Sequence, residues 1–145
     1  MHDYFSPALD ADQLRQISNL GLAHLGDGVY ELLVRTFLCL HGGVTNRQLH
    51  RATVARVSAP AQAKAMERLL PLLTEEEEAV FRRGRNTRVG GIPQHATPGE
   101  YHAATGLECL FGYLYLKGDK ERINELFDRV IAEEEKGDET KWERK

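Results

Sequence analysis

The chain has 145 residues, enough for one domain with its own core, and its 41% hydrophobic and 28% charged residues are typical of a globular protein. A net charge of −3 excludes a uniformly basic nucleic-acid-binding protein, so any such contact has to come from local basic patches. The sequence has no leader of the secretory type and no apolar run of membrane-spanning length, which predicts a cytoplasmic protein.

Hydrophobic periodicity predicts helices throughout and no strand, so the expected fold class is all-α with about seven helices. The expected helices are one after Asp10 or Asp12, one over about 20–40, one from the Thr45 cap to about 57, one from Pro60 to about 71, one after the Thr74 cap, one over about 99–116, and one after 119. Residues 87–99 are predicted to form a loop. Residues 1–134 are predicted to form one domain, and residues 135–145 a charged, disordered tail.

Two cysteines, Cys39 and Cys109, lie within apolar helical stretches. They lack the spacing of a metal-binding pair and are too few for a zinc site. We therefore expect two buried free thiols in a reducing compartment.

The stretch Gly21–Glu31 places an acid inside an apolar helix, with a glycine on each side of it. The expected buried stripe consists of Leu22, Leu25, Val29, Leu33, Thr36 and Leu40. Asp27 lies off this stripe, but its helical neighbours are apolar, so we expect it to be poorly hydrated unless a cation or a donor meets it. Each glycine costs roughly 1 kcal/mol relative to Ala, which is tolerated where backbones approach closely or a ligand needs room. An Asp that caps a helix or pairs with an Arg remains the alternative.

A second acid, Glu108, lies in the apolar stretch 101–116. Its neighbours on the helical wheel are Tyr101, Ala104, Phe111 and Tyr115. A Glu in such a position is bound to a cation, held in a hydrogen-bond network, or neutral. Together with Asp27 it suggests a carboxylate pair that holds a hard divalent ion.

Two stretches are basic. Residues 47–68 contain five Lys and Arg residues and one Glu, and we interpret them as a solvated surface. Residues 82–88 contain no acid and run into the Gly- and Pro-rich loop, which favours contact with a phosphate backbone, although Glu75–Glu78 could instead pair with these arginines. The RNA-binding candidates are Arg82, Arg83, Arg85, Asn86 and Arg88.

Leu25-Gly26-Asp27-Gly28-Val29 resembles the signature helix of the ribonuclease III endonuclease domain, with Gly28 in place of the usual Ala. Residues 105–112 resemble the second acidic helix of that family, which carries an essential metal-binding Glu. With Arg-Gly-Arg-Asn at 83–86, these motifs are most similar to the short branch called Mini-ribonuclease III. The resemblance covers about residues 9–134 of the printed sequence.

This resemblance implies a metal-dependent endoribonuclease that acts on double-stranded RNA and leaves 5′-phosphate and 3′-hydroxyl ends. Asp27 and Glu108 would be both the catalytic residues and the ligands of Mg²⁺. Apart from the resemblance, Glu31 lies one turn after Asp27 and could orient it or cap a neighbour, and Thr105, three residues before Glu108, could bond to a metal-bound water. The resemblance further implies a homodimer with one site per strand. The implied substrate is precursor large-subunit (23S) ribosomal RNA, with a ribosomal protein of that subunit as helper.

The sequence also departs from the full-length enzymes of the family. Ala23 and Thr105 stand where those enzymes have further acids, which leaves the number of metal ions open. Full-length relatives append a double-stranded-RNA-binding domain, so this chain is expected to grip RNA with its catalytic domain alone or with a partner. The alternative functions are a non-catalytic dimer that binds structured RNA and a hydrolase of small nucleotides. His24 and His102 are expected to be ordinary surface or hydrogen-bonded residues.

Overall fold

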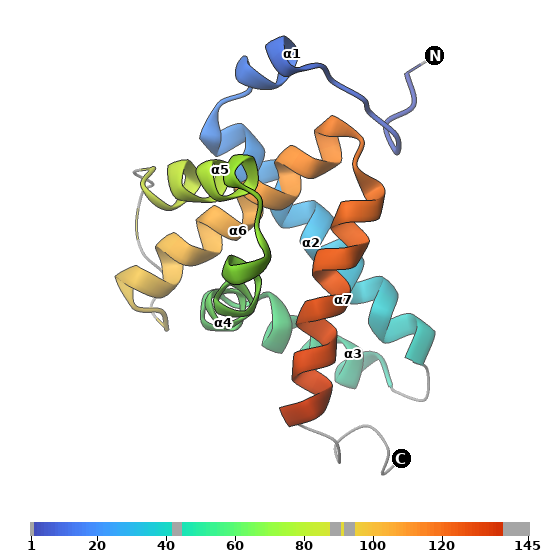
Figure 1. Ribbon diagram of the computed structural model, residues 1–145. Coiled ribbons are helices and arrows are strands. Elements are labelled where there is room, and N and C mark those ends of the chain that lie inside the picture. Colours follow the sequence, from blue (N-terminus) through green and yellow to red (C-terminus); the bar gives the residue numbers. More distant parts are fainter. Residues whose placement is uncertain (1, 42–44, 88–90, 92–94, 138–145) are drawn as a thin grey trace.

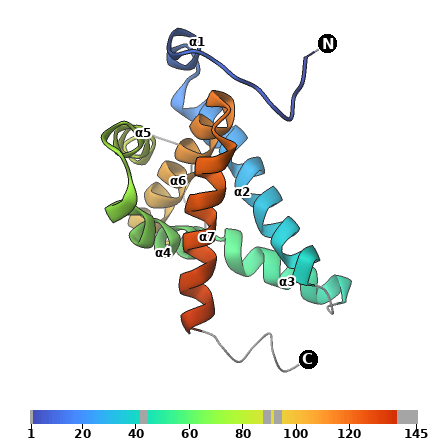
Figure 2. The same ribbon diagram turned by 45° about the vertical axis from the view of Figure 1, so that its right-hand side comes forward.

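The computed structural model describes residues 2–41, 45–87, 91 and 95–137, and within these ranges it contains helices and no strand, which confirms the all-α prediction. The elements are α1 (Ala11–Arg15), α2 (Asn19–His41), α3 (Asn46–Val57), α4 (Ala59–Leu69), the 3₁₀-helix η1 (Leu70–Leu72), α5 (Glu75–Arg85), α6 (Pro98–Lys117) and α7 (Lys120–Gly137). None of these helices combines the length and the apolar character needed to cross a membrane. In Figures 1 and 2, α6 lies at the centre, with α2, α4, α5 and α7 packed around it.

Local capping signals determine where most of these helices begin. The caps of α1, α3, α5 and α6 are Asp10, Thr45, Thr74 and Thr97, and each forms a reciprocal capping box with the Gln or Glu three residues later. Such boxes satisfy backbone N–H groups that have no partner within the helix. The predicted helix starts at Thr45 and Thr74 are therefore confirmed. The last helix continues to Gly137, past the predicted start of the tail at 135, and residues 138–145 lie outside the described part.

The central helix α6 is buried on nearly every side. From Ala104 to Leu114, every residue is buried except Glu108, which is half-buried. Leu107, Leu110 and Phe111 have no measurable exposure. Glu108 is thus the one position in the middle of the core helix where a side chain reaches solvent.

Helices α2 and α6 cross with their backbones in contact. A Cβ atom on Gly26 would lie 1.6 Å from the carbonyl oxygen of Glu108, and one on Gly112 would lie 2.2 Å from the carbonyl oxygen of Leu22. Only glycine fits at these two positions. Gly28, by contrast, has nothing within 4 Å of where its Cβ would be, so close packing within this chain does not explain that glycine.

This crossing rotates α2 relative to the orientation that its apolar stripe predicts. The buried residues of α2 are Leu22, Ala23, Gly26, Tyr30, Val34 and Leu38. The predicted stripe is wrong at Thr36 and Leu40, which are exposed, because α6 packs on the side of α2 that carries Gly26 and Tyr30. The same rotation leaves Cys39 exposed, so the prediction of burial was wrong for that thiol; Cys109 is buried as predicted.

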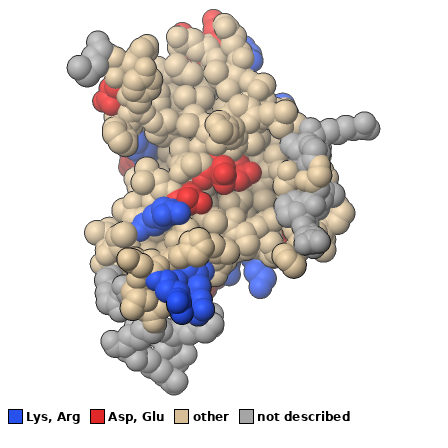
Figure 3. Space-filling view, turned by 180° about the vertical axis from the view of Figure 1, so that it is seen from behind, with Lys and Arg blue, Asp and Glu red and all other residues tan. Residues whose placement is uncertain are grey.

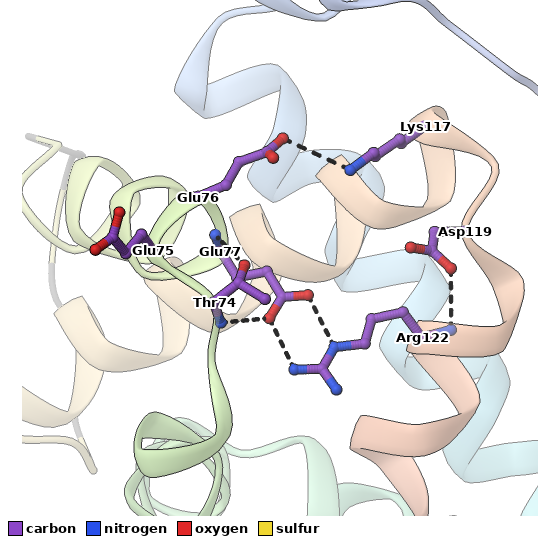
Figure 4. Close-up of a pocket in the computed structure, with 7 residues that line it drawn as sticks. All are labelled: Thr74, Glu75, Glu76, Glu77, Lys117, Asp119 and Arg122. Carbon is purple, nitrogen blue, oxygen red and sulfur yellow. Dashed lines mark hydrogen bonds and ion pairs between the residues drawn. The ribbon is translucent and has the colours of Figure 1, made fainter.

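The N-terminus of α5 lines a cavity of about 710 Å³ at the turn between α6 and α7 (Figure 4). Its walls are held together by charge pairs. The guanidinium of Arg122 donates to both carboxylate oxygens of Glu77 at 2.9 Å, and Lys117 lies 3.6 Å from Glu76. Thr74 caps the helix through the backbone N–H of Glu77. Because Glu76 and Glu77 both have cationic partners, we interpret the charge pairs around this cavity as structural contacts that hold α5 against α6 and α7.

We expect Gly26→Ala to lower the free energy of unfolding by about 3 kcal/mol or more, because the added methyl group overlaps the backbone of α6. Gly28→Ala is the matched control one half-turn away. It should be neutral or stabilising by up to about 1 kcal/mol, since Ala is the better helix former and its Cβ meets nothing in this chain. Urea unfolding of both variants measures the difference. Equal stabilities would contradict the close crossing.

Candidate functional site

The crossing of α2 and α6 brings together the two acids that stand out in the sequence. Gly26 lies against the backbone of Glu108, and Asp27 is the next residue of α2. The two side chains lie close enough to interact, since hydrogen bonding and the charge of Asp27 both raise the pKa of Glu108. The predicted carboxylate pair is thus a pair of neighbours in space, 81 residues apart in the chain.

The two acids differ in their exposure to solvent. Asp27 is exposed, so the expectation that its apolar neighbours leave it poorly hydrated was wrong: Ala23 and Tyr30 turn toward the core and Asp27 does not. Glu108 is half-buried, as expected of an acid on an apolar face. Figure 3 shows the molecule from the side of α2, where a small acidic group lies near the centre of a largely uncharged face, with basic side chains beside it.

The pKa of Glu108 is raised to about 8, first by burial and then by the hydrogen bond with Asp27 and the charge of that residue. A side-chain hydrogen bond from Gln62 acts in the opposite direction. Both effects of Asp27 reflect the cost of placing a second negative charge beside the first. Near neutral pH the metal-free pair therefore keeps one proton.

Gln62 of α4 is the functional-site neighbour that sequence reasoning missed. Its side chain is 1% exposed, and its amide donates to the carboxyl group of Glu108. A signal was present, because Gln62 precedes the buried Met66 and Leu69 at helical spacing and therefore lies on the buried face of α4. A polar residue on such a face has to find a partner, and the sequence alone does not say which.

The donor set fits a hydrated divalent cation. Two adjacent carboxylates without a countercharge are what Mg²⁺ accepts when it keeps several of its own waters. In the described ranges no cluster of three or more His, Cys, Asp or Glu residues is suited to a metal. The pair would therefore supply two protein ligands, and water would complete the coordination of the cation.

The two residues predicted to support the pair have other hydrogen-bond partners. Glu31 forms an ion pair with Arg35, with 3.0 Å between Oε2 and Nε. Thr105 is buried, and its hydroxyl donates to the carbonyl of Tyr101 at 3.0 Å. Cys109, the residue after Glu108, donates its thiol to the carbonyl of Asn19, and burial raises its pKa to about 11, which makes it a poor nucleophile.

The basic end of α5 is attached to the start of α2. Thr87 accepts a hydrogen bond from the side-chain amide of Asn19 at 3.1 Å, and Asp27 lies about two turns further along α2, roughly 12 Å away at the α-helical rise. The described RNA-binding candidates Arg82, Arg83, Arg85 and Asn86 are all exposed. Arg88 lies outside the described residues.

Some of these arginines also make contacts within α5. Arg82 pairs with Glu78 at 3.4 Å, so the alternative of pairing within the helix holds for this residue. The guanidinium of Arg85 lies 5.6 Å from the centre of the Phe81 ring. Both contacts are on the surface, where an exposed ion pair contributes little to stability, so the guanidinium groups remain accessible to a phosphate.

The basic stretch 47–68 is partly structural. Arg56 lies 3.3 Å from a carboxylate oxygen of Glu134 in α7, and Arg68 donates to the carbonyl of Val130 at 3.4 Å. These contacts fasten α3 and α4 to α7. Arg47 and Arg51 are exposed on α3, which fits the interpretation of this stretch as a solvated surface.

The sequence and the structure of this chain are both similar to those of known proteins. Residues 20–119 match the model of the ribonuclease III domain. A Mini-ribonuclease 3 from Symbiobacterium thermophilum is 47% identical over 81% of this chain and 91% of its own length, and one from Clostridium tetani is 38% identical over 90% and 88%. The crystal structure of a protein from Fusobacterium nucleatum is 32% identical and superposes with a TM-score of 0.76, covering 81% of this chain and 96% of that one.

The raised pKa of Glu108 predicts a pH dependence of stability in the metal-free protein. Unfolded Glu loses its proton near pH 4.5, whereas the folded residue keeps it to about pH 8. Between these values the folded state binds the extra proton, so the free energy of unfolding falls as pH rises through this window. Glu108→Gln has no such proton, and its stability relative to wild type should therefore rise from pH 4.5 to 8.

Urea unfolding in the presence of a chelator measures this difference. Glu31→Gln serves as the control, because Glu31 is an acid of the same helix that pairs with Arg35. Its stability relative to wild type should show no comparable rise. Parallel pH profiles for wild type and Glu108→Gln would contradict the raised pKa.

Proposed function

The chain belongs to the Mini-ribonuclease 3 family, a branch of the ribonuclease III class of endoribonucleases, and from this premise we propose that it cuts double-stranded RNA with Mg²⁺ held by Asp27 and Glu108. The observation that carries the proposal is the meeting of these two side chains at the crossing of α2 and α6. We place this activity in the cytoplasm, as the sequence predicts.

The roles of the two acids follow from their exposure. Asp27 is exposed and offers its carboxylate from the surface, while Glu108 supplies the second carboxylate from the half-buried side. Mg²⁺ held by these two carboxylates would polarise the phosphodiester and favour attack by water. Attack of water at phosphorus breaks the bond to the 3′ oxygen, which takes up a proton, so the products are a 5′-phosphate and a 3′-hydroxyl. Loss of the proton of Glu108 frees its carboxylate for the cation.

The basic end of α5 is proposed to hold the RNA backbone. The residues Arg82, Arg83, Arg85 and Asn86 are exposed at the end of α5, and Thr87, which follows them, is hydrogen-bonded to Asn19 of α2. Contacts of arginine with phosphate supply most of the affinity for a duplex without reading its sequence. Arg88 belongs to the same proposal on the basis of sequence alone.

A homodimer is proposed because α2 exposes apolar side chains. Leu20, Leu32 and Leu40 are 51%, 56% and 81% exposed, and Gly28 leaves open space on the same helix. A second copy of this chain would cover these groups and provide one site for each strand of the duplex. The proposed substrate is precursor 23S ribosomal RNA, with a large-subunit ribosomal protein as a further partner.

A second candidate function is a non-catalytic dimer that binds structured RNA. It is favoured by Ala23 and Thr105, which stand where full-length relatives of the family carry additional acids and which are both buried here. Two carboxylates are nevertheless sufficient for a hydrated Mg²⁺ ion, so the lack of the additional acids does not exclude cleavage. Incubation of duplex RNA with the protein, with and without Mg²⁺, separates the two functions.

We expect Asp27→Asn to abolish cleavage of duplex RNA in Mg²⁺, because the amide keeps the shape of the side chain and loses the charge that attracts the cation. Gel analysis of a labelled duplex measures the products. Asp128→Asn removes an exposed acid from α7 and should cleave at the wild-type rate. Turnover near wild type by Asp27→Asn would exclude the proposed site.

The same variant tests the dimer. In a mixed dimer with one Asp27→Asn subunit, only one site is intact, so the duplex should be nicked in one strand. Cutting of both strands in a single encounter, or a fully active monomer by light scattering, would contradict the two-fold arrangement.

Arg83→Ala combined with Arg85→Ala should weaken RNA binding and flatten its salt dependence. Each lost phosphate contact should lower the log–log salt slope by roughly 0.9 for a duplex. The matched control, Arg47→Ala with Arg51→Ala, removes the same charge from α3 and should leave the slope unchanged. Fluorescence anisotropy at several salt concentrations measures the binding. Equal slopes for both double variants would indicate that residues 82–88 are a solvated surface without a role in RNA binding.

A further inference from the structure

Gln62 has a polar side chain in the core without a structural reason for being polar. It is 1% exposed, and its carbonyl oxygen Oε1 is buried without any hydrogen-bond partner. Leaving such a group unsatisfied lowers the stability of the folded state, because it loses its hydrogen bonds to water and gains none in the protein. Met or Leu would fill a comparable volume in α4 without this cost, so the stability of the fold does not explain the amide.

The three other polar or charged residues that are buried as whole residues in the described part of the chain are accounted for. Thr53 donates to the carbonyl of Leu49 within its own helix, and Thr105 does the same with Tyr101. Glu77 is paired with Arg122. The polar group that meets Gln62 is the carboxyl of Glu108, on the neighbouring helix α6.

We propose that Gln62 is a positioning residue that holds the carboxylate of Glu108 in the orientation in which it binds a divalent cation beside Asp27. The inference rests on the proposed function, because it assigns a role toward the cation of that site. The amide is a neutral donor, so it stabilises an ionised carboxylate without competing with the cation. A positively charged Arg or Lys in its place would compete.

The geometry explains why such a residue is needed here. Glu108 has a longer side chain than Asp27, so fixing it in one orientation costs more rotamer freedom. Gln62 is buried on α4, which packs on α6, so its amide is held in place beside Glu108 by the packing of the two helices.

The test measures the binding of Mg²⁺ alone to the full chain. The readout is the rise in melting temperature as Mg²⁺ is added. Gln62→Met keeps the volume of the side chain and removes both the carbonyl oxygen and the NH₂ group of the amide. We expect the Mg²⁺ concentration at half-maximal response to rise about 10-fold or more, the range typical for loss of a group that orients a metal ligand. The melting temperature without metal should be unchanged or higher, whereas a merely structural residue would lower it.

The matched control is Met66→Leu, an equally buried position one turn along α4, which should not change the response to Mg²⁺. An unchanged half-maximal Mg²⁺ concentration in Gln62→Met, with wild-type folding, would overturn the inference. If Gln62→Met fails to fold, the side-chain amide signals of Gln62 in wild-type protein decide by NMR. They should shift on addition of Mg²⁺, while those of Asn19, bonded to Thr87, should not; no shift overturns the inference.

Failure of this inference is distinguishable from failure of the proposed function. If Asp27→Asn loses the response to Mg²⁺ and Gln62→Met keeps it, the cation site stands and Gln62 has no role in it. If Asp27→Asn keeps both the response and cleavage, the site itself is wrong, and the role of Gln62 falls with it.

Discussion

The contact on which the rest of the structure depends is the approach of two helix backbones at Gly26 and Gly112. Packed helices usually lie 8–10 Å apart, at a distance set by the side chains between them. Here glycines remove those side chains, and a single methyl group at either position would overlap a carbonyl oxygen of the other helix. Asp27 follows one glycine and Glu108 lies opposite it, so the contact that closes the core also brings the two carboxyl groups together.

A comparison with Glu77 shows why the acidic pair is unusual within this domain. Glu77 is more deeply buried than Glu108, and burial alone would raise its pKa, but hydrogen bonds from Arg122 and the helix cap lower it overall. Glu108 faces another acid instead, and its pKa is raised to about 8. The first arrangement is what a stable fold requires; the second costs stability unless a cation is present. Among the described residues, this contrast separates a structural acid from one suited to bind a ligand.

The arginines divide in the same way between the interior and the surface. Arg56 and Arg68 fasten α3 and α4 to α7, whereas those at the end of α5 remain exposed. The end of α5 is nonetheless rigidly placed, because a Cβ on Gly84 would lie 2.6 Å from the sulfur of Cys109, the residue next to Glu108. A second close helix crossing therefore sets the position of the basic surface relative to the acids, so that both belong to the same rigid core.

The sequence by itself determined the helical class, the helix starts at Thr45 and Thr74, and the two acids that stand out from apolar helices. These are local properties, since a capping box or an amphipathic period involves residues within one or two turns. Only the tertiary structure decided that Asp27 is exposed and that Gln62 meets Glu108. Which face of a helix is buried depends on where its neighbour packs, and the contact of α2 with α6 at two distant glycines is not encoded in the periodicity of either helix.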